Sequence, residues 1–137
     1  MNYIHTDTLK IAFEEGVPPD GMPVILLHGW PDAPRGWKAV SKHLQDNGWH
    51  TVVPYLRGLH PAEFLSQETP RVGSAVALAQ DASDLANVLK LDRFAGIGHD
   101  RGARTAFTLA ALFPERITCI AALSVAIRGA QFEGHLG

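Results

Sequence analysis

The stretch of residues 94–104 limits the fold of this chain more than any other part of the sequence. An apolar run ends in Gly-His-Asp-Arg-Gly at 98–102, and a segment with helical apolar periodicity follows at once. This order predicts a buried strand, a sharp turn and a helix. A side chain at Gly98 or Gly102 would collide with the strand or the helix, which indicates a strained turn around Asp100. We therefore expect Asp100 to stand clear of the backbone at a helix N-terminus, where the helix dipole favours an ionised carboxylate.

Predicted strands and helices alternate along the rest of the chain. Short apolar runs predict strands at 24–27, 51–53, 93–98 and 117–125. Helical periodicity predicts helices at 37–47, 74–89 and 102–113, the second with Ser74 as its N-cap. Residues 3–13 alternate weakly and predict one or two more strands, whereas 55–72 is expected to be a surface connection. This order predicts an α/β fold, with a mostly parallel sheet and helices on both faces.

Apolar residues at helical spacing mark the faces that should be buried. In the first predicted helix they are Trp37, Val40 and Leu44, and in the second the stripe begins at Val76. Cys119 lies in the last apolar run and is expected to be a buried, small hydrophobic side chain. Because it is the only cysteine, the chain has no internal disulfide, which favours a reducing, cytoplasmic location.

Charge and composition argue against several classes of partner. The 137 residues carry 12 basic and 14 acidic side chains, interspersed, for a net charge of −2, so no surface for nucleic acid is expected. No apolar stretch is long enough to cross a membrane, and the N-terminus lacks the pattern of a signal peptide. The seven histidines form no pair at metal-binding spacing, so no metal site is predicted.

Three short motifs follow three predicted strands and together resemble a known family. His-Gly-Trp-Pro at 28–31 follows the first buried strand, Arg57-Gly58 follows the next, and Gly-His-Asp-Arg-Gly at 98–102 follows the third. In this order and at these distances they resemble the α/β-hydrolase fold, specifically its aspartate-nucleophile branch of epoxide hydrolases and haloalkane or haloacetate dehalogenases. The resemblance covers nearly the whole chain, and it implies no cofactor.

The resemblance implies that Asp100 is a nucleophile. The aspartate stands where the nucleophile elbow of a serine hydrolase carries serine. A carboxylate suits displacement at a saturated carbon, where a halide or an epoxide oxygen leaves and an alkyl ester forms on the enzyme. When water attacks this ester, negative charge develops on a side-chain oxygen of Asp100. In the family two backbone N–H groups stabilise that charge, and the matching positions are Trp30 and Arg101.

Arg101 and Arg104 suggest what the substrate is. They lie three positions apart at the start of the predicted helix, so both guanidinium groups could project on one side, near Asp100. Asp-Arg-Gly-x-Arg resembles the haloacetate dehalogenases, which implies that the two arginines bind a substrate carboxylate. In the alternative, Arg104 is structural and pairs with Asp32 or another loop carboxylate, and Arg101 only replaces the tryptophan more usual in epoxide hydrolases. The sequence leaves both readings open.

The other motif residues are expected to shape the backbone of the site. They are His28, Gly29 and Pro31 in the first turn, and Gly98, His99 and Gly102 in the elbow. The two histidines would hydrogen-bond the loop and the elbow rather than act as general base. His60 stands where the resemblance leads us to expect a glycine, so the loop after Arg57 is either strained or shaped differently.

The family's general-base histidine, its acid partner and its helical cap have no counterpart in this sequence, and Ser124 occupies the earlier acid position. We therefore expect residues 1–137 to be the N-terminal portion of a single α/β-hydrolase domain, ending after the strand that follows the nucleophile helix. Two hypotheses follow: part of a hydrolase for a small-molecule substrate, with the histidine supplied from elsewhere, or a truncated, inactive relative with a binding role or none. In the complete domain the strand from Ile117 to Val125 would lie beside the next strand, so without it we expect an exposed apolar edge and self-association or aggregation.

Overall fold

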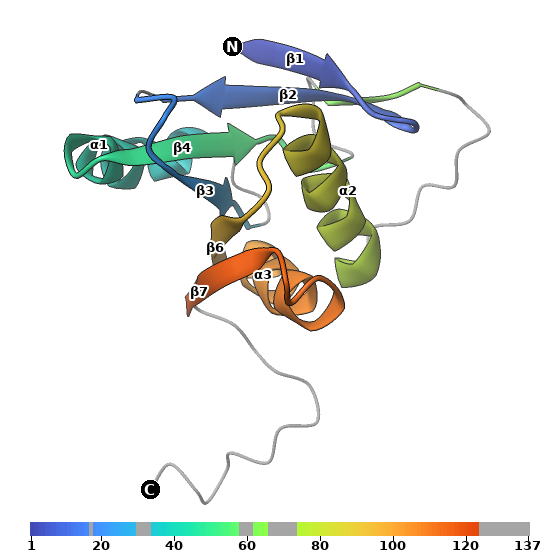
Figure 1. The fold of residues 1–137 in the computed structure, drawn as a ribbon. Helices are drawn as coiled ribbons and strands as arrows, with labels where there is room; N and C mark the ends of the chain where they lie inside the picture. Colours follow the sequence, from blue (N-terminus) through green and yellow to red (C-terminus); the bar gives the residue numbers. More distant parts are fainter. Residues whose placement is uncertain (17, 30–33, 58–61, 66–73, 124–137) are drawn as a thin grey trace, which may run out of the picture.

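Six strands lie side by side in one sheet, in the order β1-β2-β4-β3-β6-β7, and the short β5 pairs with β2 (Figure 1). The computed structural model describes residues 1–16, 18–29, 34–57, 62–65 and 74–123. The strands are β1 (Asn2–His5), β2 (Leu9–Glu15), β3 (Met22–Leu27), β4 (Trp49–Pro54), β5 (Glu63–Phe64), β6 (Phe94–His99) and β7 (Ile117–Leu123). The helices are the 3-10 helix η1 (Pro34–Trp37), α1 (Lys38–Asp46), α2 (Ala75–Val88) and α3 (Arg101–Leu112).

The centre of the sheet is parallel, as the sequence predicts. Strand β3 pairs in parallel with β4 on one side and with β6 on the other, and β6 pairs in parallel with β7. The weakly alternating N-terminal stretch forms an antiparallel hairpin, β1 and β2, and β2 runs antiparallel to β4. Leu27 at the end of β3 lies opposite Gly98 of β6. The turns that follow β3 and β6 therefore lie together at the carboxyl ends of the two strands.

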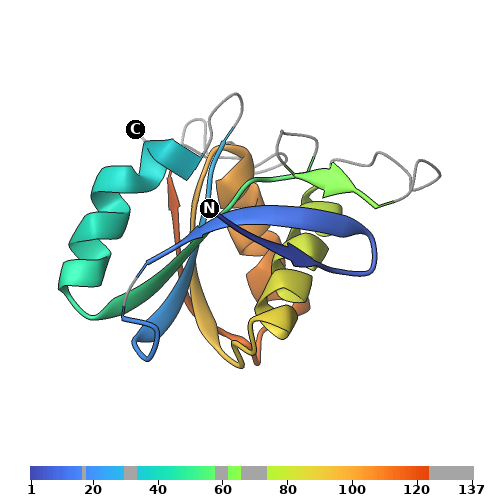
Figure 2. The ribbon, with the colours of Figure 1, turned by 90° about the horizontal axis from the view of Figure 1, so that it is seen from above.

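The helices cover both faces of the sheet, with α1 on one face and α2 and α3 on the other (Figure 2). Ser74 caps α2 as predicted, because its side-chain oxygen accepts a hydrogen bond from the Ala77 N–H at 3.2 Å. Among the described residues, no helix combines the length and the apolar character that a membrane span requires.

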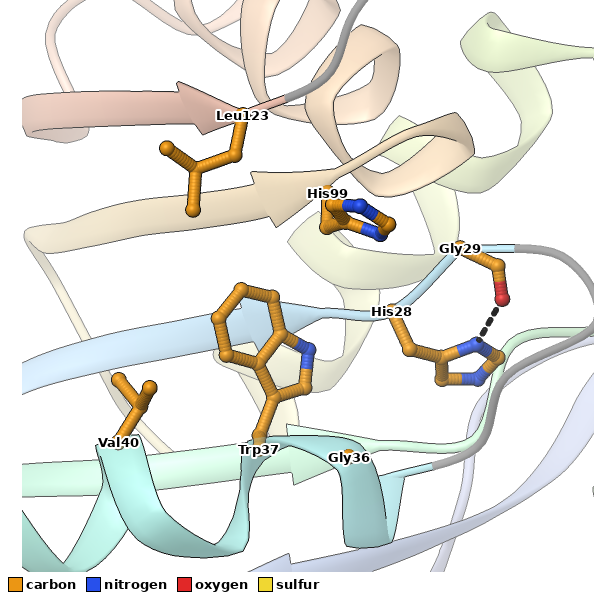
Figure 3. Close-up of a pocket in the computed structure, with 7 residues that line it drawn as sticks. All are labelled: His28, Gly29, Gly36, Trp37, Val40, His99 and Leu123. Carbon is orange, nitrogen blue, oxygen red and sulfur yellow. Dashed lines mark hydrogen bonds between the residues drawn. The ribbon is translucent and has the colours of Figure 1, made fainter.

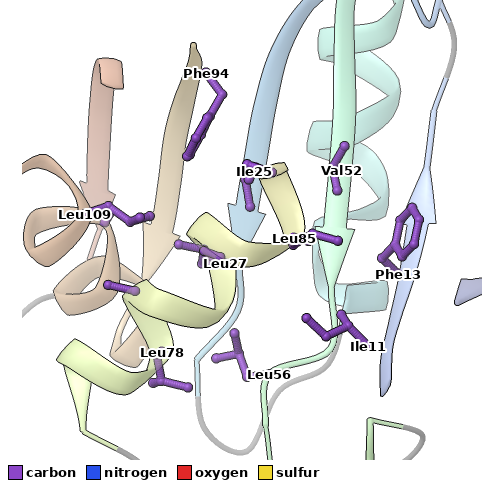
Figure 4. Close-up of a cluster of buried hydrophobic side chains, with 14 of the residues drawn as sticks. Ile11, Phe13, Ile25, Leu27, Val52, Leu56, Leu78, Leu85, Phe94 and Leu109 are labelled. Atoms are coloured by element: carbon purple, nitrogen blue, oxygen red, sulfur yellow. The ribbon is translucent and has the colours of Figure 1, made fainter. Parts of the chain in front are cut away.

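Strand β3 is buried from both sides, which explains its unbroken apolar run. Ile25 and Leu27 belong to the cluster under α2 and α3, whereas Val24 and Leu26 belong to the cluster under α1, and all four are fully buried. The larger cluster also holds Leu85 of α2 and Leu109 of α3, with side chains of β2 and β4 (Figure 4). Alternate residues of one strand thus join two cores on opposite faces.

Some of the expected burial is wrong. Val40 and Val76 were expected on buried helix faces, but they are 39% and 58% exposed. Cys119 is an exposed free thiol rather than a buried one. Cys119 lies on β7, the outermost strand of the sheet. Helix α1 packs on β4, so it does not cover Cys119. Strand β5 is missed within 55–72, a segment that otherwise lies largely outside the described residues.

Candidate active site

Asp100 occupies the turn between β6 and α3, in a backbone conformation that few residues adopt. Its φ is 56° and its ψ is −115°. The Asp100 N–H donates to the carbonyl of Leu123 at the end of β7, at 3.1 Å, and its carbonyl accepts from the N–H groups of Ala103 and Arg104 at 3.0 and 3.2 Å. These bonds hold the positive φ in place, so the strained turn expected from the sequence is present.

The two glycines that flank Asp100 are required by close backbone contacts. A Cβ at Gly98 would overlap the carbonyl of Gly102 and meet the Ala103 nitrogen, within the first turn of α3. A Cβ at Gly102 would overlap the carbonyl of Leu27, at the end of β3. Helix α3 therefore packs its first turn directly against the ends of β6 and β3, as the collision argument from the sequence predicts.

Gly29 brings the other predicted turn against the elbow. A Cβ built on Gly29 would lie 2.7 Å from the Cβ of Asp100 and 3.2 Å from its Oδ2. The backbone after β3 and the carboxylate of Asp100 are thus immediate neighbours. Trp30 and Pro31 follow Gly29 in sequence and lie outside the described residues, so the backbone N–H predicted at Trp30 stays a prediction.

His28 is buried, with 2% of its surface exposed, and both ring nitrogens face backbone groups. The Leu56 N–H donates to Nε2 at 3.1 Å, so Nε2 is an acceptor and carries no proton. Nδ1, 3.0 Å from the carbonyl oxygen of Gly29, is then the protonated nitrogen and donates to it (Figure 3). This neutral ring connects the turn after β3 to the chain after β4, in agreement with the predicted loop-bonding role.

A cavity of about 240 Å³ lies beside this turn, on the face of the sheet that carries α1. His28, Gly29 and His99 line one part of it, and Trp37, Val40 and Leu123 supply apolar walls (Figure 3). His99, the residue before Asp100, belongs to this cavity. The cavity combines His28 and His99 with an apolar lining, next to the end of the strand that carries the nucleophile, and the His28 ring points away from Trp37 toward the Gly29 carbonyl (Figure 3).

Arg101 and Arg104 lie in the first turn of α3, as predicted. Arg101 is partly buried and Arg104 is exposed. The carbonyl of Arg101 accepts a hydrogen bond from the Thr105 hydroxyl at 2.9 Å, and the Arg104 carbonyl accepts one from Thr108 at 2.8 Å. Asp32, the alternative partner for Arg104, lies outside the described residues, so a substrate role and a structural role both stay open.

The sequence analysis missed a buried ion pair, which joins Arg57, after the end of β4, to Asp81 on α2. Arg57 Nε and Nη2 donate to Asp81 Oδ2 and Oδ1, each at 2.6 Å, and both side chains are only 10% exposed. The hydrogen bond that Arg57 donates to Asp81 raises the pKa of the Arg57 guanidinium. Burial raises the pKa of the Asp81 carboxyl, whereas Arg57 acts in the opposite direction. One signal was present in the sequence, since Asp81 falls inside the apolar stripe of α2.

No cluster of three or more His, Cys, Asp or Glu side chains that could hold a metal ion occurs within the described ranges.

A family model for the α/β hydrolase fold matches residues 22–134. Epoxide hydrolase A of Mycobacterium tuberculosis is 28% identical over 125 residues, which make up 89% of this chain and 37% of that protein. A fluoroacetate dehalogenase of a Burkholderia species is 31% identical over 114 residues, 82% of this chain and 37% of the dehalogenase. The chain therefore spans less than half the length of these relatives.

Solved structures show the same relationship. A Klebsiella pneumoniae protein, provisionally described as an epoxide hydrolase, is 38% identical with a TM-score of 0.89, over 97% of this chain and 44% of that one. Epoxide hydrolase A of Mycobacterium thermoresistibile gives a TM-score of 0.84 at 26% identity, over 98% of this chain and 42% of that one. With its elbow, its His-Gly turn and these matches, the chain belongs to the α/β-hydrolase fold family.

Proposed function

We propose that this chain supplies the nucleophile half of a hydrolase of the epoxide hydrolase or haloacid dehalogenase type, with Asp100 as the nucleophile. The supporting observation is the contact between Gly29 and Asp100, which joins the His-Gly turn to a strained elbow that carries a carboxylate. Relatives named epoxide hydrolase and fluoroacetate dehalogenase support the same reaction type. A truncated, inactive relative with a binding role or none is the alternative.

The proposed reaction has two steps. In the first, a carboxylate oxygen of Asp100 attacks a saturated carbon, a carbon–oxygen bond forms, and halide or the epoxide oxygen leaves with the electron pair. In the second, water adds to the ester carbonyl and the alcohol leaves, which restores the carboxylate. The backbone N–H groups of Trp30 and Arg101 are the proposed donors to the oxyanion of the second step. The general-base histidine is proposed to come from outside these 137 residues.

The first turn of α3 supports an anionic substrate. Arg101 and Arg104 both lie in this turn, directly after Asp100, and guanidinium groups bind carboxylates through charge-assisted, two-pronged hydrogen bonds. The fluoroacetate dehalogenase among the relatives supports the same substrate class. We therefore propose a haloacetate-type substrate, with a neutral epoxide as the alternative in which both arginines are structural.

Intact-mass analysis tests the proposal. The folded chain, incubated with bromoacetate, should gain the mass of one carboxymethyl group, and the adduct should persist because the proposed base is absent. Peptide mapping should place it on Asp100, and Asp100→Asn should not form it. Cys119 is an exposed thiol that bromoacetate also alkylates, so the experiment is done in a Cys119→Ser background.

The outcomes separate the hypotheses. An adduct from bromoacetate but not from a neutral epoxide supports the arginine site, and Arg104→Gln should then slow adduct formation about tenfold or more, the loss of a charged hydrogen bond. An adduct from the epoxide alone makes both arginines structural. A folded chain that reacts with neither is the inactive relative.

We also propose that two copies of the chain associate through β7. This strand has no charged residue, and Cys119, Ala121 and Leu123 are exposed on it. One edge of β7 pairs with β6, and in the described part of the chain no strand pairs with the other edge. An unpaired, uncharged strand edge is a template for the same strand of a second copy. Apart from the small-molecule substrate, neither nucleic acid nor membrane is a proposed partner.

We also propose that the protein is located in the cytoplasm. The exposed, unpaired thiol of Cys119 supports it, because such thiols persist in a reducing compartment. Fractionation of cells that make the tagged protein would test it, and recovery outside the cytoplasm would contradict it.

A further inference from the structure

The buried ion pair of Arg57 and Asp81 lies one residue away from a hydrogen bond that reaches the candidate site. Leu56 and Arg57 are consecutive, and each is held by a different partner. The Leu56 N–H donates to His28 Nε2 at 3.1 Å, and the Arg57 side chain binds Asp81 through two bonds of 2.6 Å. We infer that Arg57 and Asp81 are positioning residues, which hold the His28–Gly29 turn against Asp100.

The α2 end of this connection is rigid. Asp81 lies on α2 among Leu78, Ala82 and Leu85, all of them buried in the larger core. A two-pronged arginine–carboxylate pair fixes orientation as well as distance, because both partners are planar. Leu56 is itself buried in the same core, so apolar packing already holds its place in the fold. The ion pair adds a directional restraint at the next residue, which limits rotation of the Leu56 peptide group.

The other end of the connection reaches the backbone of the site. With Nε2 accepting from Leu56, His28 keeps its proton on Nδ1 and donates it to the Gly29 carbonyl at 3.0 Å. A peptide unit is planar, so whatever holds this carbonyl also holds the backbone N–H at the other end of the same unit. That N–H belongs to position 30, which lies outside the described residues and is an oxyanion donor in the proposed function only. Small errors in the direction of this N–H should slow the attack of water on the Asp100 ester, the second step of the proposed reaction.

Stability alone does not explain the pair. A buried ion pair often contributes little to folding, and replacing both partners with hydrophobic residues of similar volume is often neutral or stabilising. Such a replacement nevertheless removes the directional hold on Leu56. The double variant Arg57→Met with Asp81→Leu therefore separates the two roles, because it should fold and still lose the positioning.

The first measurement does not depend on activity. Amide hydrogen exchange is followed by NMR in the wild type, in the double variant and in Asn87→Ala. Asn87→Ala is the matched control, since Asn87 lies exposed on the same helix. Exchange at Leu56 should be at least about tenfold faster in the double variant alone, while exchange at Val52, inside β4, stays unchanged.

The second measurement rests on the proposed function. The carboxymethyl ester on Asp100 is formed first and then exposed to alkaline buffer, where hydroxide adds to the ester carbonyl and glycolate leaves. Loss of the adduct should be about tenfold slower or more in the double variant, because a misdirected oxyanion donor stabilises less charge. Formation of the adduct should change less than about twofold, since that step develops no oxyanion.

The two measurements distinguish the positioning role of Arg57 and Asp81 from the proposed function. If the wild type forms no adduct, the proposed function fails, and Leu56 exchange alone decides the positioning role. If the adduct forms, faster exchange together with slower adduct loss supports the inference. A change in only one of the two measurements, or in neither, overturns it, because the ion pair would then not act on the site through Leu56.

Discussion

Gly102 has no room for one more carbon atom. A Cβ at this position would overlap the Leu27 carbonyl, so the first turn of α3 rests on the backbone at the end of β3. Backbone at a strand end cannot move aside as a flexible side chain can. The position of Asp100 therefore depends on a residue that makes no chemical contribution of its own.

Gly102→Ala should lower the free energy of unfolding by about 3 kcal/mol, the upper part of the range for overpacking, because the obstructing atoms are backbone. Urea denaturation followed by circular dichroism measures the change. Gly36→Ala is the matched control: no atom lies within 4 Å of its built Cβ, so it should change the free energy by less than about 0.5 kcal/mol. Equal losses for the two variants would contradict the close approach.

At the scale of elements, α2 is followed by a residue with positive φ that is not glycine. Lys90 follows the helix with a φ of 60°, a conformation that glycine normally supplies. The Leu91 N–H donates to the carbonyl of Ala86 at 2.8 Å, and the Lys90 N–H donates to that of Asn87 at 3.1 Å. These two bonds satisfy helix-end carbonyls at the cost of a strained, exposed lysine.

Lys90→Gly should raise the free energy of unfolding by about 1 kcal/mol, because glycine adopts positive φ without steric cost. Thermal and urea denaturation both measure it. Lys90→Ala removes the same long side chain but keeps the Cβ, so it should give no gain. Equal stabilisation by alanine and glycine would mean that the side chain, and not the backbone conformation, is responsible.

Local signals account for what the sequence predicts well. The glycines at 98 and 102, the Ser74 cap and the apolar run of β3 each act within a few residues, so the elbow, α2 and the central strand could be predicted. Contacts between distant segments could not be. The pairing of Arg57 with Asp81 requires knowing that α2 faces the residues that follow β4, and the exposure of Cys119 requires knowing that β7 is the outer strand.

At the scale of the whole molecule, the two outer strands of the sheet differ. Strand β1 is four residues long and mostly polar, with Asn2 and His5 exposed at its ends. Strand β7 has seven residues without a charge. Short edge strands resist pairing with another chain, so association should use the longer β7 rather than β1.

Sedimentation velocity over a range of concentrations tests association. The wild type should show a dimer that Ala121→Glu weakens at least about tenfold, because like charges would meet across the paired strands. Ala111→Glu makes the same change on an exposed position of α3 and should leave the dimer intact. The Cys119 thiol should also react more slowly with a disulfide reagent in the dimer. A monomer at every concentration would contradict the proposal.

The elbow has an evolutionary consequence. Its shape depends on the glycines at 29, 98 and 102 and on backbone bonds, and the Asp100 side chain makes no capping hydrogen bond to α3. The backbone bonds that hold the turn therefore do not depend on which small side chain occupies position 100. Replacing Asp100 by serine would exchange a carboxylate for a hydroxyl on the same framework, which makes this turn a natural starting point for divergence.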